Sequence, residues 1–254
     1  MMSLSGKRGL IVGVANHHSI AAGCATVMRA QGAELVLTYL NDRARPFVEP
    51  VAEAVEATAL LPLDVARPND VDAVFNWIET NWGGLDFLLH SIAFCPKADL
   101  HADVIDCSRE GFLEAMDISC HSFIRMAARA VPLMKEGGSL LTMSYQGADR
   151  VVDHYNIMGP VKAALETTAR YLAADLGGKG IRVNVISPGP IATRAASGID
   201  HFDALISDAL DRAPDHRVAT IEEVGAVAAF LASDGASAVT GGVHYVDRGV
   251  NVIA

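Results

Sequence analysis

The residues with the clearest chemical potential are a tyrosine and a lysine seven positions apart, Tyr155 and Lys162. Residues 155–176 have a helical pattern, and seven residues at about 100° each put both side chains on one face. A nearby ammonium favours the tyrosinate and strengthens the phenol as a proton donor. The ordinary alternative is a buried tyrosine beside a lysine whose stem covers apolar surface. Taken alone, the pair favours that alternative, so the case for chemistry depends on the surrounding elements.

Those elements alternate between short apolar strands and helices along the whole chain. Several strand candidates are continuously apolar, as strands buried on both faces should be. The alternation predicts an α/β fold, a single-domain Rossmann-type doubly wound parallel sheet of about seven strands with helices on both faces, spanning residues 1–254. The expected strands are 8–12, 34–39, 59–63, 87–91, 139–144, 182–187 and 243–246. The expected helices are 20–31, 69–81, 122–135, 155–176 and 220–232, with a weak one at 202–212.

The turn after the first strand has the character of a dinucleotide-binding turn without the usual G-x-G-x-x-G pattern. Gly13 permits a sharp turn, and the small residues Ser19 and Ala21 let the backbone approach a pyrophosphate. The helix that begins at Ile20 would offer free N–H groups and a positive dipole end, and Ser19 is a candidate cap. A strand–turn–helix that binds nothing is the alternative.

The ends of later strands strengthen the case for a cofactor. Asp64 and Val65 follow the third strand, where adenine is often held, and Ser91 and Ile92 follow the fourth, beside the ribose and nicotinamide. A long irregular segment opens with Pro-Gly-Pro at 188–190 after the sixth strand. Such a position suits a substrate-binding lid, which we place at about 191–217.

The amino-acid composition argues against several other classes of protein. The chain has 254 residues, 51% of them apolar, and a net charge of −10, which argues against non-specific binding to nucleic acid or to an anionic membrane. No apolar run approaches the roughly 18 residues of a membrane span, and no signal-type segment precedes the first strand, so we expect a cytoplasmic protein. The four cysteines form no C-x-x-C pair and the nine histidines no H-x-x-x-H spacing, so we expect reduced thiols and no metal.

The sequence resembles the short-chain dehydrogenase/reductase superfamily, and within it the bacterial enoyl-acyl-carrier-protein reductases. The resemblance is carried by several motifs that occur here in the family's order. Gly159 breaks the superfamily's usual Y-x3-K spacing, whereas residues 155–162 fit the Y-x6-K of the enoyl reductases. The G-x5-S-I-A loop is matched at 13–21, and H-S-I-x-F at 90–94. A T-x-S-Y stretch ends at Tyr145, S-x-G-P-I-x-T covers 187–193 and A-A-S-G-I covers 195–199.

The resemblance implies NADH-dependent reduction of the trans-2 double bond of an enoyl thioester on acyl carrier protein, in type II fatty acid biosynthesis, by a homotetramer. It implies that Tyr155 stabilises the enolate, that Lys162 holds the nicotinamide ribose and that Tyr145 lies at the acyl pocket. The cofactor-binding residues it implies are Gly13, Ser19, Ile20, Leu40, Asp64, Val65, Ser91, Ile92, Lys162, Ile191 and Thr193. The substrate-binding residues are Phe94, Cys95, Met158, Ile199 and Phe202, with Cys95 expected to be a small pocket residue without thiol chemistry.

Two departures from the family pattern bear on specificity. Leu40 stands where the family often has a glutamine that reads the adenosine end, and Asp42 would repel a 2′-phosphate, which favours NADH. Arg43 and Arg45 lie close enough to leave NADPH open. Asp200 and Asp203 stand where relatives often place basic residues that meet the acidic carrier protein, which predicts weaker docking.

Two other functions remain open at this point. One is a short-chain reductase that acts on another enoyl or carbonyl thioester. The other is a dinucleotide-sensing protein on the same fold with no turnover, against which the intact Tyr155 and Lys162 pair argues.

Overall fold

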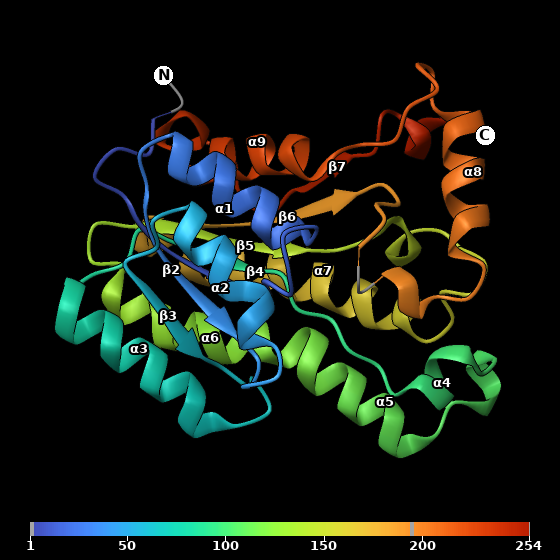
Figure 1. Cartoon of the computed structure of the whole chain (residues 1–254), viewed down its shortest axis with the longest axis horizontal. Coiled ribbons are helices and arrows are strands. Elements are labelled where there is room, and N and C mark those ends of the chain that lie inside the picture. The colour runs from blue at the N-terminus through green and yellow to red at the C-terminus, as the bar shows by residue number, and fades with distance from the viewer. Residues whose placement is uncertain (1–2, 194–195, 254) are drawn as a thin grey trace.

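The computed structural model describes residues 3–193 and 196–253. Seven parallel strands form one sheet in the order β3-β2-β1-β4-β5-β6-β7 (Figure 1). The strands are β1 (Arg8–Val12), β2 (Glu34–Tyr39), β3 (Ala59–Pro62), β4 (Phe87–His90), β5 (Gly138–Met143), β6 (Ile181–Pro188) and β7 (Val243–Val246). The chain order reverses between β1 and β4, which is where a doubly wound sheet opens a crevice for ligands. The predicted fold class is therefore confirmed.

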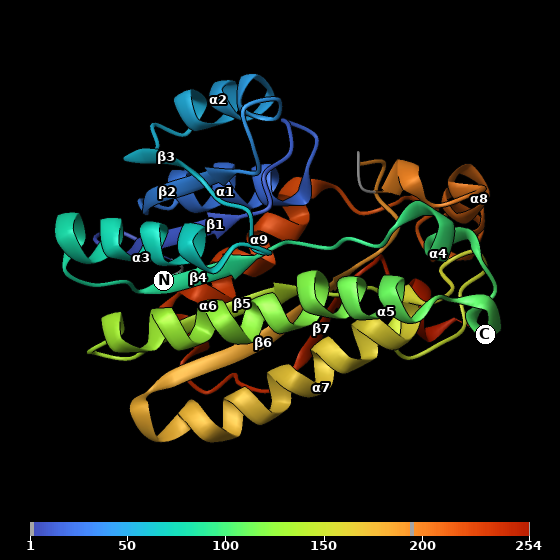
Figure 2. The same ribbon diagram turned by 90° about the horizontal axis from the view of Figure 1, so that it is seen from below.

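Helices cover both faces of the sheet (Figure 2). One layer contains α1 (Ile20–Ala30), α2 (Arg45–Ala54) and α9 (Ile221–Ala232), and the other contains α3 (Pro68–Trp82), α6 (Ser122–Ala130) and α7 (Met158–Leu176). Three more helices extend beyond the carboxyl ends of the strands, α4 (Lys97–His101), α5 (Arg109–Met116) and α8 (Phe202–Arg212) (Figure 1). A π-helical turn, Asp117–His121, joins α5 to α6. Short 3-10 turns lie at Val104–Asp106, Val131–Leu133, Gln146–Ala148, Gly177–Lys179, Ala196–Gly198, Asp234–Ala236 and Val250–Val252.

The two layers explain why the central strands are mainly apolar. In β1, Ile11 packs with the first layer, whereas Leu10 and Val12 pack with the second, and all three are fully buried. Burying a side chain of this size contributes about 1.5–3 kcal/mol. Within the described residues no helix is long and apolar enough to cross a membrane.

Most predicted elements coincide with the observed ones to within one or two residues, and α8 has the predicted bounds. The capping residue Thr220 accepts a hydrogen bond from the Glu223 amide, and the Glu223 side chain accepts one from the Thr220 amide. The helix predicted at 122–135 ends at Ala130, because Pro132 cannot continue the hydrogen-bond ladder. Helices α2, α4 and α5 are absent from the prediction.

The position of Tyr155 differs from the prediction, and this difference concerns the site directly. Tyr155 was predicted on the helix of Lys162, but α7 begins at Met158 and Tyr155 lies in the turn before it. His154 and Asn156 both have positive φ, at 62° and 43°, which breaks the helical path on either side of Tyr155. The two side chains therefore converge through a turn and a helix, not through one helical face.

Candidate functional site

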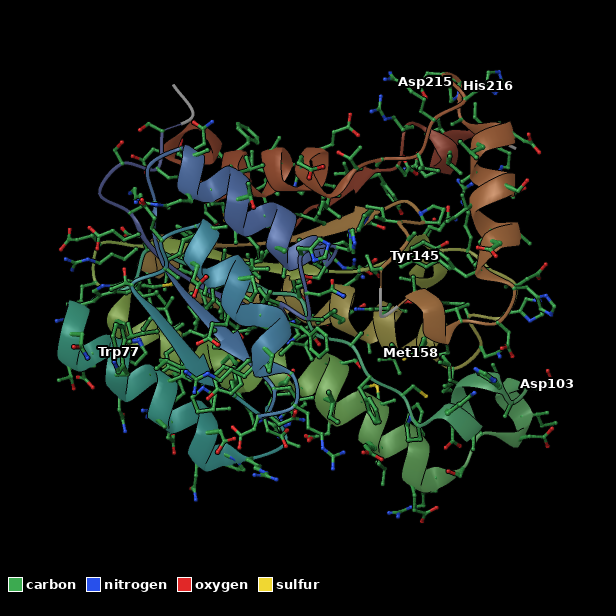
Figure 3. The ribbon with its side chains drawn as sticks, viewed as in Figure 1. Trp77, Asp103, Tyr145, Met158, Asp215 and His216 are labelled. Carbon is green, nitrogen blue, oxygen red and sulfur yellow. The ribbon has the colours of Figure 1, made fainter. Side chains whose placement is uncertain are left out.

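A pocket of about 360 Å³ opens at the carboxyl ends of β4, β5 and β6. It is closed on the outer side by segment 196–202, which leads into α8. Tyr145 and Met158 lie on the α8 side of the sheet (Figure 3). The pocket brings together thirteen of the predicted site residues: Ile20, Ser91, Ile92, Phe94, Cys95, Tyr145, Tyr155, Met158, Lys162, Ile191, Thr193, Ile199 and Phe202.

Tyr155 is buried in the pocket wall and its ring is packed on two sides. The Tyr145 ring lies 4.9 Å away between centroids, and a Cβ added at Gly147 would come within 2.4 Å of the Tyr155 ring, so only glycine fits there. Burial, with smaller contributions from Tyr145 and Glu166, raises the pKa of Tyr155 well above its ordinary value. The expectation that a nearby ammonium would favour the tyrosinate is therefore not met: the phenol keeps its proton and is available as a hydrogen-bond donor.

Lys162 is buried one turn into α7, with 4% of its surface exposed. Its Nζ donates to the Met143 carbonyl at 2.7 Å, which fixes the ammonium at the end of β5. Burial lowers the pKa of Lys162 to about 8, against an opposing effect of Cys120 and Glu166. The lysine is thus still charged at neutral pH, and an ammonium with two further N–H groups can hold hydroxyls in the pocket.

Behind this pair lies a second link between α7 and β5 that the sequence analysis missed. Ser144 Oγ donates to Glu166 Oε1 at 2.5 Å, and both residues are buried. Glu166 follows Lys162 by one helical turn, so two successive turns of α7 are each tied to the end of β5. The i,i+4 spacing of Lys162 and Glu166 places both on one face of α7, but it gives no sign of Ser144, 22 positions earlier in the chain.

His90, at the head of the H-S-I-x-F motif, was quoted in the sequence analysis but given no role. It is fully buried, with Nδ1 3.0 Å from Thr142 Oγ1 and Nε2 2.8 Å from Ser122 Oγ. Ser122 donates its own proton to the Ile118 carbonyl at 2.6 Å, so Nε2 carries the imidazole proton. Burial, with a smaller effect of Lys162, lowers the pKa of His90 to about 3, so the ring is neutral.

The pyrophosphate turn fits a dinucleotide, although one of its predicted details is wrong. Gly13 has φ of 94°, and a Cβ there would come within 1.9 Å of the Ser91 carbonyl oxygen, so a side chain cannot be accommodated. Ser19 was a candidate helix cap, but its hydroxyl bonds no amide of α1; it donates instead to the Asn16 carbonyl at 2.7 Å. The amides of Ile20 and Ala21 have no hydrogen-bond partner among the described residues, which leaves them for an anion.

The predicted adenine residues lie outside the pocket, further along the same edge of the sheet. Leu40 follows β2 and is 56% exposed, and Asp64 and Val65 follow β3. Because β3, β2, β1 and β4 are neighbours, these residues, Gly13 and Ser91 form one continuous rim. An extended dinucleotide fits such a rim, with its far end at Lys162.

Cys95 is buried in the pocket near Asp99. Burial, with a smaller effect of Asp99, raises the pKa of its thiol to about 11, so the thiol stays protonated. This agrees with the expectation of a wall residue, since the thiolate is the reactive form of cysteine.

The segment that closes the pocket is fastened to α4. His101 lies between two acceptors, with Nδ1 3.0 Å from Asp200 Oδ2 and Nε2 3.0 Å from the Gly198 carbonyl. Asp200 therefore has a partner within the molecule, whereas Asp203 is exposed on α8. Ala195, in the motif at 195–199, lies outside the described residues.

Comparisons with known proteins match the whole chain. The family model described as Enoyl-(Acyl carrier protein) reductase matches residues 13–251. The chain is 49% identical to "Enoyl-[acyl-carrier-protein] reductase [NADH] 2" of Rhizobium meliloti, over 98% of this chain and 93% of that protein. It is 46% identical to an NADH enoyl-[acyl-carrier-protein] reductase of Haemophilus influenzae, over 99% of this chain and 96% of that protein.

Solved structures agree with these relatives. The enoyl-(acyl-carrier-protein) reductase of Anaplasma phagocytophilum in complex with NAD superposes with a TM-score of 0.96 at 44% identity, over 100% of this chain and 97% of that one. The Bacillus cereus enoyl-acyl carrier protein reductase with NADP+ and indole naphthyridinone gives a TM-score of 0.97 at 42% identity, over 100% of both chains.

Proposed function

The chain belongs to the enoyl-[acyl-carrier-protein] reductases, and from this premise we propose which of its side chains carry the reaction. The protein is an NADH-dependent oxidoreductase of fatty acid biosynthesis, and its substrate is an enoyl thioester on acyl carrier protein. It reduces the trans-2 double bond to give the saturated acyl thioester. The observation that carries the residue assignment is that Tyr155 and Lys162 are both buried and both line the same pocket at the strand ends.

We assign the cofactor to the rim that runs from Leu40 to Lys162. Asp64 and Val65 would hold the adenine, and Gly13 with the amides that begin α1 would hold the pyrophosphate. Ser91, Ile92, Ile191 and Thr193 would flank the nicotinamide ribose, whose hydroxyls Lys162 would hold. When bound, NADH supplies a hydride to the β-carbon of the enoyl thioester.

Tyr155 stabilises the enolate that forms as the β-carbon is reduced. Its protonated phenol donates to the thioester oxygen, where negative charge develops, and the packed ring holds that donor in place before the substrate arrives. Lys162 adds a positive charge on the same side of the pocket. Phe94, Cys95, Met158, Ile199 and Phe202 form the apolar wall for the acyl chain and exclude water from the reacting atoms.

A single assay tests the activity. NADH oxidation is followed by absorbance with the crotonyl thioesters of acyl carrier protein and of coenzyme A. We expect turnover with both, with a higher kcat/KM for the carrier-protein thioester. A protein that binds NADH but oxidises none with either thioester would be a sensor and not a reductase.

The turn after β2 predicts a preference for NADH. Asp42 and Arg43 are both exposed there, and the Arg45 guanidinium is already engaged by Glu49 at 3.2 Å. A 2′-phosphate would therefore meet a carboxylate and one uncommitted arginine. We expect kcat/KM for NADH to exceed that for NADPH by at least about tenfold. Asp42→Asn should raise kcat/KM for NADPH and leave kcat/KM for NADH unchanged. A tenfold preference of the unmodified enzyme for NADPH would contradict this.

We propose that the enzyme is a homotetramer. Apolar side chains are exposed along the outer surface of α5, α6 and α7, among them Phe112 at 38%, Leu113 at 47% and Tyr171 at 72%. A helical face of this kind is suited to close packing against a second copy. Light scattering at micromolar protein should give about four times the mass of one chain, and a monomeric mass would exclude the tetramer.

We also propose a cytoplasmic location. Cys24, Cys95, Cys107 and Cys120 are free thiols, which suits a reducing compartment.

The charge of α8 gives a prediction about the carrier protein. Asp203 is exposed near the mouth of the pocket, and carrier proteins are acidic, so we propose that this residue slows docking. Asp203→Lys should raise kcat/KM severalfold for the carrier-protein substrate. The same variant should leave an N-acetylcysteamine thioester unchanged, because that substrate carries no protein charge. An equal response of both substrates would show that Asp203 acts on the pocket and not on docking.

A further inference from the structure

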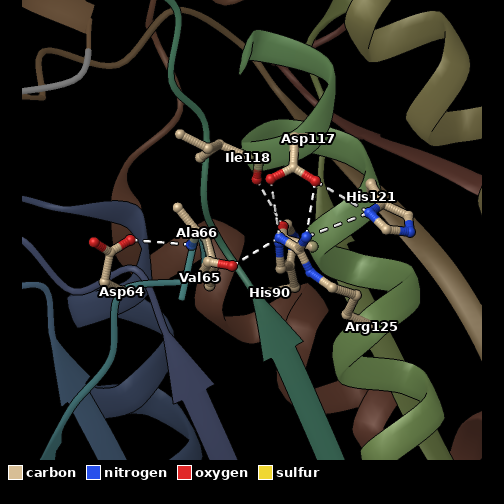
Figure 4. A network of polar contacts seen from close by, with 9 residues as sticks. Asp64, Val65, Ala66, His90, Asp117, Ile118, His121 and Arg125 are labelled. Carbon is tan, nitrogen blue, oxygen red and sulfur yellow. Dashed lines mark hydrogen bonds and ion pairs between the residues drawn. The ribbon is translucent and has the colours of Figure 1, made fainter. Parts of the chain in front are cut away.

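Arg125 of α6 reaches across the molecule to the loop that follows β3. Its Nη2 donates to the Val65 carbonyl at 2.7 Å, 60 residues away in the sequence. Its Nη1 donates to Asp117 Oδ1 at 2.8 Å, and Nη2 to Asp117 Oδ2 at 3.3 Å (Figure 4). The guanidinium thus joins a carboxylate at the start of the π-helical turn to a backbone carbonyl of the cofactor rim.

Asp117 fixes the orientation of this guanidinium. The carboxylate meets both terminal nitrogens of Arg125, and His121 Nδ1 lies 3.1 Å from Asp117 Oδ1 on the side away from Val65. Burial would raise the pKa of Asp117, but the hydrogen bonds from Arg125 and His121 outweigh it and lower the pKa, so the carboxylate is charged. A planar guanidinium held at two points has its other N–H groups fixed in direction, so that one of them points at the Val65 carbonyl, which a lysine cannot reproduce.

The loop has few other anchors. Its other hydrogen bonds involve β2 and residues 64–70. The Leu63 amide donates to the Tyr39 carbonyl at 2.8 Å, Asp70 Oδ2 accepts from the Asp64 amide at 3.1 Å, and Asp64 Oδ1 accepts from the Ala66 amide at 3.0 Å. Among the described residues, Arg125 provides the hydrogen bond that ties this loop to a different helix. The Val65 side chain is also buried in the core, so the Asp117–Arg125 pair adds the polar tie that holds the Val65 carbonyl in place.

We propose that Arg125, oriented by Asp117, is a positioning residue for the adenine end of the NADH site. It contacts no reacting atom; it holds the Val65 backbone where adenine is recognised. The inference rests on the proposed roles of Asp64 and Val65. It predicts that loss of the guanidinium weakens cofactor binding while the chemical step in the saturated enzyme is unchanged.

Arg129 provides a matched control, because it lies one turn further along α6 and makes an equivalent tie elsewhere. Its Nε is 3.2 Å from Asp72 Oδ1 and its Nη2 donates to Asn76 Oδ1 at 2.9 Å, both on α3. Arg129→Met removes a guanidinium that fastens α6 to its neighbour but leaves the loop after β3 untouched. A general loosening of this helical layer would therefore affect both variants alike.

The test measures KM for NADH and kcat with crotonyl-coenzyme A, together with the dissociation constant of ADP, which carries the adenosine half of the cofactor and no nicotinamide. For Arg125→Met we expect KM for NADH and the ADP dissociation constant to rise together by about tenfold, with kcat within about twofold. Arg129→Met should change none of the three. No rise in either constant for Arg125→Met, or an equal rise for Arg129→Met, would overturn the proposal.

A second variant tests the proposal if Arg125→Met does not fold, and the activity of the unmodified enzyme tests the proposed function separately. If Arg125→Met does not fold, Asp117→Asn retains the side-chain shape but not the charge, and it should raise the same two constants with kcat unchanged; a fall in kcat alone would overturn the proposal. Failure of the proposed function is distinguishable, because the unmodified enzyme would then oxidise no NADH. Failure of this inference leaves an active enzyme in which Arg125 does not matter to the adenosine half.

Discussion

Tyr155→Phe should lose about 10²- to 10³-fold in kcat and keep its affinity for NADH within about twofold. The substitution removes one hydroxyl and leaves the ring packed against Tyr145 and Gly147. The raised pKa of Tyr155 means that the wild-type residue meets the substrate as a phenol. The lost interaction is therefore one hydrogen bond to the developing enolate, which exists only as the transition state is approached. Steady-state kinetics with crotonyl-coenzyme A and NADH fluorescence titrations measure the two quantities separately.

Tyr145→Phe is the matched control for this experiment. The Tyr145 hydroxyl lies beside the same pocket and is buried, but no described residue accepts its proton. Burial raises the pKa of the Tyr145 phenol as well, so both tyrosines are protonated in the unmodified enzyme. We expect Tyr145→Phe to cost less than about tenfold in kcat. A loss as large as that of Tyr155→Phe would mean that the two phenols act as a unit and that the oxyanion role cannot be given to Tyr155 alone.

The sheet could be predicted because its physical signal is local. A strand buried on both faces is mainly apolar, and β1 and β4 meet that condition over residues 10–12 and 87–89. The convergence of Gly13 and Ser91 then follows from topology, since the carboxyl ends of parallel strands share one edge. Lys162 reaches the same edge from α7, where its Nζ donates to the Met143 carbonyl. The start of α7 could not be predicted in the same way. The helical spacing continues through Asn156, whereas the backbone of His154 and of Asn156 is left-handed, which the spacing does not reveal.

The hydrogen bonds that Ser144 forms with Glu166, and Arg125 with Val65, could not be predicted from the sequence for a different reason. Ser144 and Glu166 are 22 residues apart, and Arg125 and Val65 are 60 apart, so neither pair has a spacing that a local pattern can reveal. In the sequence, Glu166 and Arg125 are ordinary charged residues of a helix, where a solvated face is the usual interpretation. Only the fold shows that each is turned inward toward the end of a strand.

Lys162 gives the second large effect, and pH separates its role from that of Tyr155. Lys162→Ala should raise the dissociation constant of NADH and lower kcat, because it removes both a donor for the ribose hydroxyls and a positive charge near the enolate. In the unmodified enzyme the ammonium loses its proton as the pH rises through about 8, the lowered pKa of this lysine. The kcat/KM for NADH should therefore be full below that pH and fall above it. Tyr155 cannot cause this fall, since burial moves its pKa upward and away from that range.

Glu166→Gln provides the internal check on this assignment. The Glu166 carboxylate opposes the burial that lowers the pKa of Lys162, so its neutralisation should move the alkaline fall in kcat/KM to a lower pH. The amide keeps an acceptor oxygen for Ser144, which preserves the second tie between α7 and β5. Lys162→Arg should remove the fall altogether, because a guanidinium stays charged throughout this range. Normal NADH binding by Lys162→Ala, or an unchanged alkaline limb in Lys162→Arg, would show that another group holds the ribose and that the buried ammonium serves only to fasten α7 to the sheet.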